Sequence, residues 1–398
     1  MHFPKDRVQA VLESDFIKAL LSFDKDYEHI NIILDIIASL IYDKSLYFPS
    51  LIENGLLNLF IQNPSWIEYY VTTGKQLQTI SILKIAKLIA ISFTNYIVHI
   101  ISHPKFMNLL LILMKKPQQP FDLEIQKYIL SVETYYHIIL YEPSYINKYY
   151  RTLYPSLEYS FNSTIDKIKE TTPLIIHLLK RFFVEADFIE CLGIDTNKLT
   201  FILSVITKGN SKEKSSILEL LIEMASWPQI SSLLLKLDFI SFSIDFSSNN
   251  QDFSNLIFDV VSNMMSHTDI CEQILNIDGF VDYLVESVIN GSIKVSMSAS
   301  LCISWIIYYK DLDYIDKVVS DDVFETISDY LTENSVNYVK IMLTALENVL
   351  GKESKSGKKR FHQLLCDETV YDQIHTYFDS SDEDLSIIAS NILKMLDD

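Results

Sequence analysis

Two histidines in the N-terminal half have the spacing of a pair of metal ligands. His99 and His103 stand four residues apart, so on a helix their imidazole rings would lie on one face, as two zinc ligands do. No cysteine or carboxylate accompanies them locally as a third ligand, and Pro104 ends the helix beside them. We therefore interpret both as core or helix-end histidines and predict no metal and no cofactor.

Carboxylates with the spacing of an acid–base pair are also present. Glu219 and Glu223 share one face of an expected helix, but paired carboxylates without a pocket motif are usually solvated. The sequence contains no GxGxxG or GxxxxGK[ST] phosphate loop, no HExxH metalloprotease motif and no GxSxG nucleophile elbow. We predict that the chain is not an enzyme.

The composition limits both the fold and the partners. Hydrophobic residues make up 48% of the 398 residues, whereas only 8 are glycine and 10 are proline, which favours long helices over glycine-rich sheet folds. The formal net charge of −19 argues against nucleic acid or an anionic membrane as a partner. It leaves a basic protein partner open; the alternative is that the charge only keeps a hydrophobic chain soluble.

The cysteines and the N-terminal residues bear on the compartment. The four cysteines lie far apart and form no CxxC pair, at Cys191, Cys271, Cys302 and Cys366. This is typical of reduced thiols rather than of a disulfide or zinc framework. The N-terminal MHFPKDRVQAVLESDF has no apolar signal-peptide core, and Lys84 and Lys87 interrupt the most hydrophobic stretch, residues 80–101. We expect a soluble protein of the cytoplasm, the nucleus or both.

A short pattern recurs along the chain: a small or acidic residue, a large apolar anchor, and then apolar residues at helical spacing. DFIKALLSF, GFVDYLVESVI and TVYDQIHTYF are examples. The nine anchors, which are 40 to 50 residues apart, are Phe16, Leu56, Phe106, Leu153, Leu199, Phe239, Phe280, Val323 and Val370. Because armadillo and HEAT repeats are about 40–47 residues long, this spacing predicts a helical repeat protein.

Longer apolar helices follow the anchors after a polar break, as in KSSILELLIEMASW and VSMSASLCISWIIYY. Their apolar residues recur at intervals of three and four, on a face that only a neighbouring repeat can bury. We therefore predict one all-α domain over residues 1–398, a right-handed α-solenoid of about nine armadillo repeats with the longer helix on the inner face. The basic insertion GKESKSGKKR, residues 351–360, is expected to be a loop between the eighth and ninth repeats. It would be either simply solvated, a localisation signal or a contact controlled by phosphorylation.

Residues 238–398 contain runs of a more specific kind. GFVDYLVESVI is followed by SASLCISWIIYY, and VKIMLTALENVLGKE comes later. These runs resemble importin-α, the armadillo adaptor of nuclear import, in which tryptophans on the inner helices hold the stems of lysines and asparagines one turn later bond the peptide backbone. The resemblance implies a non-catalytic adaptor that holds an extended, basic segment of a protein partner in a concave groove.

The resemblance also assigns peptide-binding roles to particular residues. Trp305 matches a slot tryptophan, and Tyr309 stands one turn later, where the family has asparagine. Asn263 and Asn348 match ladder asparagines, and Asp259 occupies the tryptophan position before Asn263. The sequence has no basic N-terminal segment of the kind that binds importin-β, so we do not expect that type of partner.

Charged residues on the predicted inner helices change sign along the chain. The early ones are basic, at Lys84, Lys87, Lys127, Lys180 and Arg181. The later ones are acidic, at Glu219, Glu223, Asp259 and Glu347. If these residues face the groove, its C-terminal half would attract a basic segment. The alternative function is a general armadillo scaffold, or a regulatory subunit of a complex, that binds no localisation signal.

Overall fold

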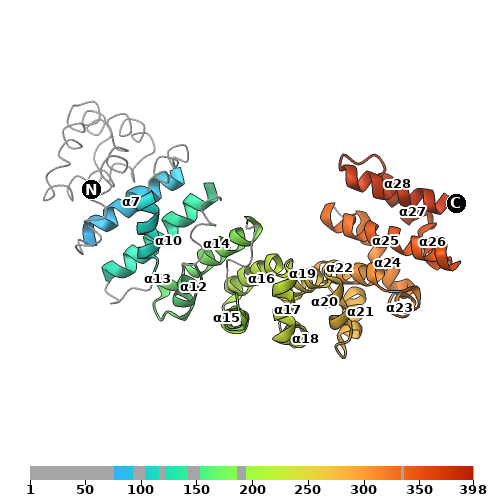
Figure 1. Ribbon diagram of the computed structural model, residues 1–398, viewed down its shortest axis with the longest axis horizontal. Helices are drawn as coiled ribbons and strands as arrows, with labels where there is room; N and C mark the ends of the chain where they lie inside the picture. The colour runs from blue at the N-terminus through green and yellow to red at the C-terminus, as the bar shows by residue number, and fades with distance from the viewer. Residues whose placement is uncertain are drawn as a thin grey trace. The chain divides into compact units, whose positions relative to one another are not determined.

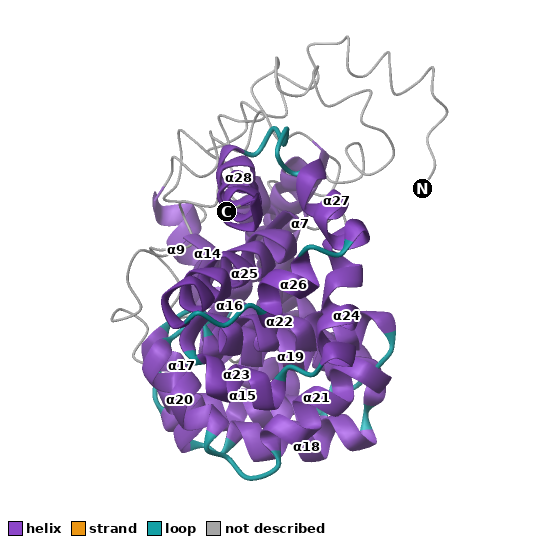
Figure 2. Cartoon of the chain, turned by 90° about the vertical axis from the view of Figure 1, so that its right-hand side faces the viewer, coloured by secondary structure: helices purple, strands orange, loops and turns teal. Residues whose placement is uncertain are grey.

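The computed structural model describes residues 76–92, 104–115, 122–141, 153–185, 194–332 and 336–397, and within these ranges every regular element is a helix (Figure 2). The predicted all-α class is thereby confirmed for these residues. The repeats expected near Phe16 and Leu56, and the pair His99 and His103, lie outside the described residues. The chain forms two compact units, Met1–Gly193 and Ile194–Asp398, so the single array over 1–398 stays a prediction and each unit is described by itself.

The first unit contains two of the predicted anchors at helix starts. Phe106 lies near the start of α9 and Leu153 begins α12. The described helices of this unit are α7 (Gln76–Ser92), α9 (Pro104–Leu113), α10 (Asp122–Tyr141), α12 (Leu153–Asn162), α13 (Asp166–Lys169) and α14 (Thr172–Glu185). Helix α10 packs against α7, α9 and α14, and its Tyr128 is fully buried with its hydroxyl donating to the carbonyl oxygen of Ser156 at 3.1 Å.

The second unit repeats a group of three helices. Four groups have a short first helix, a second helix that carries the predicted anchor, and a long third helix, and the group before them contributes its second and third helices to the described residues. The first helices are α17 (Pro228–Lys236), α20 (Thr268–Leu275), α23 (Leu312–Val318) and α26 (Arg360–Leu365). The second helices are α15 (Thr196–Lys208), α18 (Phe239–Asn249), α21 (Phe280–Asn290), α24 (Asp321–Asp329) and α27 (Glu368–Thr376). The third helices are α16 (Ser211–Ala225), α19 (Ser254–Met265), α22 (Ile293–Tyr309), α25 (Val336–Ser356) and α28 (Glu383–Asp397).

The third helices form a ladder in which each packs against the next, from α16 to α28 (Figure 1). Apolar side chains fill the interface, among them Phe258 of α19 and Ile303 of α22, both almost fully buried. The buried hydroxyls of Ser300 and Ser304 on α22 donate within their own helix, to the carbonyls of Ser296 at 2.8 Å and Ser300 at 2.9 Å. Because these hydroxyls have hydrogen-bond acceptors in their own helix, they can be buried in a predominantly apolar interface.

The first helices escaped the sequence pattern, which assigned two helices to each repeat. They have only six to nine residues, too few for a periodic apolar stripe to stand out. At the anchors Phe239 and Phe280, the residue before the anchor is the turn between the first and second helices. At Gly279 this turn has φ of 78°, a left-handed conformation in which glycine is favoured, and at Asp238 it has φ of 56°.

The expected loop at residues 351–360 is wrong for its first six residues, because α25 continues to Ser356. Lys352 and Glu353, inside this stretch, join neighbouring helices. The ammonium of Lys352 donates to three carbonyl oxygens at the C-terminal end of α22, at 2.7 to 2.8 Å. The buried carboxylate of Glu353 accepts the backbone N–H groups of Phe361 and His362, at the start of α26. The helix is extended here because both side chains satisfy helix ends that would otherwise lack partners.

Basic residues that follow α25 are engaged with the preceding repeat. Lys358 contacts Asp313 at 2.8 Å and Asp316 at 3.0 Å. Arg360 contacts Asp316 at 3.1 Å and Asp321 at 2.7 Å. The insertion therefore pairs part of its positive charge with acidic side chains of α23 and α24 instead of presenting all of it to solvent. Among the described helices, none is long and apolar enough to cross a membrane.

Candidate functional site

A groove of about 630 Å³ lies across the third helices of three successive repeats. Its lining residues come from α19, α22 and α25, with one from α16, and recur three or four positions apart on each helix, as expected for one exposed helix face. They are Ile222, Asn255, Asp259, Ser262, Asn263, Lys294, Met297, Ser298, Leu301, Asn337, Tyr338, Lys340 and Ile341. The groove thus crosses the ladder and combines apolar, amide and charged side chains.

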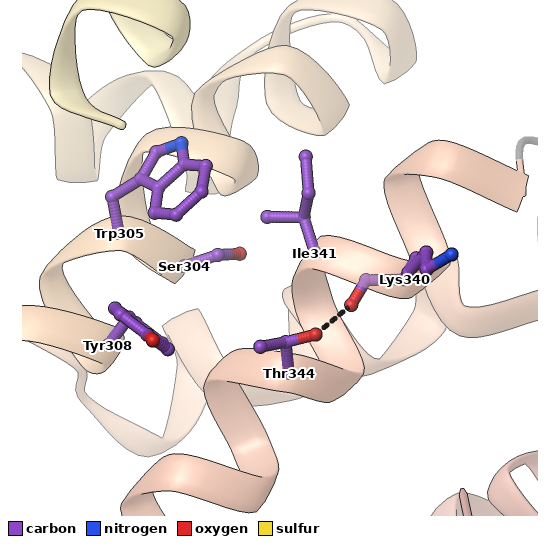
Figure 3. Close-up of a pocket in the computed structure, with 6 residues that line it drawn as sticks. All are labelled: Ser304, Trp305, Tyr308, Lys340, Ile341 and Thr344. Atoms are coloured by element: carbon purple, nitrogen blue, oxygen red, sulfur yellow. Dashed lines mark hydrogen bonds between the residues drawn. The ribbon is translucent and has the colours of Figure 1, made fainter. Parts of the chain in front are cut away.

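A smaller pocket of about 90 Å³ lies between α22 and α25. Figure 3 shows Ser304, Trp305 and Tyr308 on one helix facing Lys340, Ile341 and Thr344 on the next. Lys340 and Ile341 also line the groove, so the two hollows adjoin. We call the smaller one the Trp305 pocket.

Trp305 is half-buried and fixed by two contacts. Its indole Nε1 donates to the hydroxyl of Ser262 on α19 at 3.1 Å, and its ring stacks on Tyr309, with centroids 6.0 Å apart and planes at 20°. The Tyr309 hydroxyl donates to the carbonyl of Ser266 at 2.5 Å. Trp305 therefore presents a rigid aromatic wall to its pocket, whereas Tyr309 lines neither hollow and ties α22 to the end of α19.

Asn263 and Asp259 both line the groove, as the family resemblance implied for a binding role. The amide of Asn263 donates through Nδ2 to the carbonyl of Ile222 on α16 at 2.8 Å, which leaves less of it for a ligand. Burial raises the pKa of the Asp259 carboxyl above its ordinary value, and a hydrogen bond from Ser298 opposes that rise. The carboxyl of Asp259 thus releases its proton less readily than that of an exposed aspartate.

The other assigned residues lie outside the lining of both hollows. The Glu347 carboxylate accepts a hydrogen bond from Nδ2 of Asn391, on α28, at 2.8 Å. The Oδ1 atom of Asn348 is buried and meets no hydrogen-bond donor among the described residues. Glu223 is half-exposed on α16 beside the groove residue Ile222. Their part in peptide binding, like that of Trp305, Tyr309, Asn263 and Asp259, stays a prediction.

Three further residues of the groove were not predicted from the sequence. Asn255 lies two turns before Asn263 on α19, and Asn337 and Lys294 lie in the first turns of α25 and α22. The sequence does carry a signal for Asn255, because Asn255, Asp259 and Asn263 follow one another at intervals of four residues and therefore lie on one helix face. The comparison with a family motif drew attention to the middle and C-terminal parts of these helices only.

The charge of the groove differs from the predicted acidic one. Its lining contains a single carboxylate, Asp259, and two lysines. The ammonium of Lys340 pairs with Asp384 and lies 3.8 Å from Asp382, whereas exposed Lys294 has no ion-pair partner in the part of the chain that the structure describes. Lys294 is also in the first turn of α22, where the helix dipole adds positive potential.

The predicted basic charge of the early helices is also partly neutralised. In the first unit, the Lys87 ammonium pairs with Glu133 at 2.7 Å. Lys127 is buried and pairs with Glu124 at 2.6 Å. Lys84 is exposed. The predicted change from basic early helices to acidic later helices therefore does not hold for the charges that are unpaired and exposed to solvent.

Comparisons with known proteins support the fold. No family model matches the sequence, and the search of curated proteins finds no match. The crystal structure of an engineered protein is similar over 100% of this chain and 92% of its own, with a TM-score of 0.68 at 13% identity. A designed armadillo repeat protein aligns with 61% of this chain and 99% of its own, with a TM-score of 0.47 at 13% identity. The whole-chain likeness supports a fold shared with the engineered protein. The three-helix repeats of the second unit are those of an α-solenoid of armadillo type, the predicted fold class.

Proposed function

We propose that this chain binds an extended segment of a protein partner in the groove across α19, α22 and α25. The observation that carries the proposal is the row of amide side chains, Asn255, Asn263 and Asn337, in one groove that crosses three stacked repeats. An amide supplies both a donor and an acceptor, and an extended peptide offers both on every residue. Two of these amides lie on α19 and one lies on α25, with α22 between them. They therefore span two helix spacings of about 8–10 Å each, which roughly five or six residues of an extended chain cover at about 3.3 Å per residue.

A more specific form of this function is an importin-α-like adaptor that binds a lysine-rich localisation segment for nuclear import, in the cytoplasm and the nucleus. Its support is Trp305 on the wall of the adjoining pocket and Asn263 and Asp259 in the groove. The alternative is an armadillo scaffold that recognises other segments. That form is favoured by the lysines of the groove and by the position of Tyr309, which ties two helices where the family has an asparagine.

The proposal is tested by selecting binders from a displayed library of random twelve-residue peptides and measuring affinity by fluorescence anisotropy. The double variant Asn255→Ala, Asn337→Ala removes two amides from the groove. Since each peptide hydrogen bond contributes about 0.5–1.5 kcal/mol, we expect affinity to fall about tenfold or more. Asn197→Ala is the matched control, because Asn197 is an exposed asparagine on α15 that does not line the groove.

Two results would count against the groove. One is a selection that yields no binder, and the other is binding that the double variant and the control variant change equally little. A lysine-rich localisation peptide, titrated in parallel, separates the two forms of the function. Binding that Trp305→Ala weakens supports the adaptor, whereas selected peptides that bind while the lysine-rich one does not support the scaffold.

A further inference from the structure

The groove and the Trp305 pocket together indicate the chemistry of the bound segment. Building on the proposed peptide groove, we infer that the segment carries an acidic side chain against Lys294 and an uncharged aliphatic side chain in the Trp305 pocket. This is the opposite of a lysine-rich segment. The inference rests on which polar groups are already used inside the protein and which are still available to a ligand.

The polar atoms around the Trp305 pocket are largely engaged within the protein. The hydroxyl of Ser304 donates to the carbonyl of Ser300 at 2.9 Å, and that of Thr344 donates to the carbonyl of Lys340 at 2.7 Å (Figure 3). The indole N–H of Trp305 is used by Ser262. What remains for a ligand is the indole face, the ring and hydroxyl of Tyr308, and the methyl groups of Ile341 and Thr344. This surface is largely apolar and suits an apolar side chain.

The volume of the pocket limits the size of that side chain. An apolar cavity of about 150 Å³ accommodates benzene, so about 90 Å³ admits a short aliphatic side chain such as valine or leucine but not a large aromatic one. An aliphatic group of this size removes its surface from water against Trp305 and Ile341. That burial is the favourable term at this position.

A lysine would be poorly placed in the same pocket. No carboxylate lines it, and the ammonium group at its edge belongs to Lys340. The two aspartates near Lys340 already contact that ammonium. A lysine stem lying on Trp305 would therefore bring a second positive charge toward Lys340 without an acceptor of its own.

Lys294 supplies the available positive charge in the groove. It is exposed and forms no ion pair with any described residue, so a ligand carboxylate would compete only with water for its ammonium. The single carboxylate of the lining, Asp259, is half-buried and accepts a hydrogen bond from Ser298. Charge complementarity therefore favours an acidic side chain at Lys294 over a basic one at Asp259.

The two positions also set a minimum spacing in the segment. Lys294 and Trp305 are eleven positions apart on α22, which corresponds to about 16 Å along a helix. An extended chain advances about 3.3 Å per residue. A segment that also crosses the neighbouring helices therefore needs at least roughly five positions between the acidic and the aliphatic residue.

The inference is tested by reading the sequences of the peptides that the full chain selects from the random library. We expect Asp or Glu to be enriched at least roughly five positions from Val, Leu or Ile, and Lys and Arg to be depleted. The best selected peptide is then synthesised, together with a form in which Lys replaces its acidic residue. Affinity for the acidic form should fall as salt is raised and should exceed that for the lysine form by about fivefold or more.

Two pairs of variants assign the contacts. Lys294→Glu should weaken the acidic peptide about fivefold to tenfold and strengthen its lysine form, whereas Lys212→Glu should change neither. Lys212 is the matched control because it is exposed at the same second position of its helix, α16, and does not line the groove. Thr344→Phe, which fills the Trp305 pocket, should weaken binding about tenfold or more, whereas Thr344→Val keeps the shape and should not.

The outcomes separate this inference from the proposed function. Enrichment of Lys and Arg, with binding that depends on Asn255 and Asn337, would overturn the inference and leave the groove intact as a peptide site. Equal effects of Lys294→Glu and Lys212→Glu would overturn the role of Lys294. A selection without any binder would refute the proposed function and the inference with it.

Discussion

Replacing Glu353 by alanine should destabilise the last described repeat strongly, although the sequence suggested that this residue belongs to a solvated loop. The side chain is only 3% exposed. Its Oε1 accepts the N–H of Phe361 at 2.9 Å and its Oε2 accepts the N–H of His362 at 2.8 Å. Residue Lys359, which precedes α26, provides no side-chain cap, so Glu353 performs that function from the preceding helix.

The magnitude follows from these two hydrogen bonds. A hydrogen bond to a charged group contributes about 1.5–3 kcal/mol, and a buried N–H left unsatisfied costs a similar amount. Glu353→Ala removes both acceptors at once, and because water reaches His362 in part, we expect a loss of about 3–4 kcal/mol. Glu353→Gln keeps one acceptor oxygen and should lose about half as much.

The assay is urea unfolding combined with native-state amide hydrogen exchange, because a terminal repeat can open without the rest of the array. The amides of Phe361 and His362 should exchange faster in Glu353→Ala. Glu325→Ala is the control, since Glu325 is exposed on α24 and its removal should change stability by less than about 0.5 kcal/mol. If Glu353→Ala and Glu325→Ala unfold alike and the two amides keep their protection, the capping role of Glu353 is wrong.

Three further predictions concern buried groups. Burial raises the pKa of Asp259, so the folded state holds this proton more tightly than the unfolded state. The residue therefore lowers stability as pH rises from its unfolded pKa to its folded pKa. Asp259→Asn should flatten that part of a stability–pH curve measured by urea unfolding, and an unchanged curve would contradict this prediction. Exposed Cys366 should react with iodoacetamide in the native protein, whereas Cys302, fully buried with a pKa well above the ordinary value, should react only after unfolding, as peptide mass spectrometry would reveal. Tyr128→Phe leaves the carbonyl of Ser156 without this donor and should lower the free energy of unfolding by about 1–2 kcal/mol, whereas no change in the denaturation midpoint would argue against that hydrogen bond.

The sequence predicted the repeated helices because the signal for them is local. Anchors such as Phe239 and Phe280 begin second helices, and their spacing matches an armadillo repeat. The short first helices were not predicted, since helices of six to nine residues carry too few apolar positions to show a period. The extension of α25 through Lys352 and Glu353 was not predicted either, because polar residues in series are typical of a loop unless distant groups satisfy them.

The candidate site was predicted in part. The motif comparison directed attention to Trp305, Asn263 and Asp259, which the structure places around the two adjoining hollows. It also assigned a role to Glu347, whose carboxylate accepts a hydrogen bond from Asn391 in the structure. It did not identify Lys294. A motif assigns a residue by its type and position, whereas availability to a ligand depends on which neighbours have already used its polar atoms.

The sequence by itself determined the all-α class, the repeat length and the stretches that become long helices, because apolar periodicity and helix breaks act over only a few residues. Tertiary structure alone decided which face of each third helix stays open and which charges remain available there. Those properties arise from contacts between residues about 40 positions apart, such as Trp305 with Ser262 and Lys340 with Asp384. Stacking of the repeats thus creates the groove and pairs Lys340 with Asp384. Lys294 is left as the lysine of the groove lining without an ion-pair partner among the described residues.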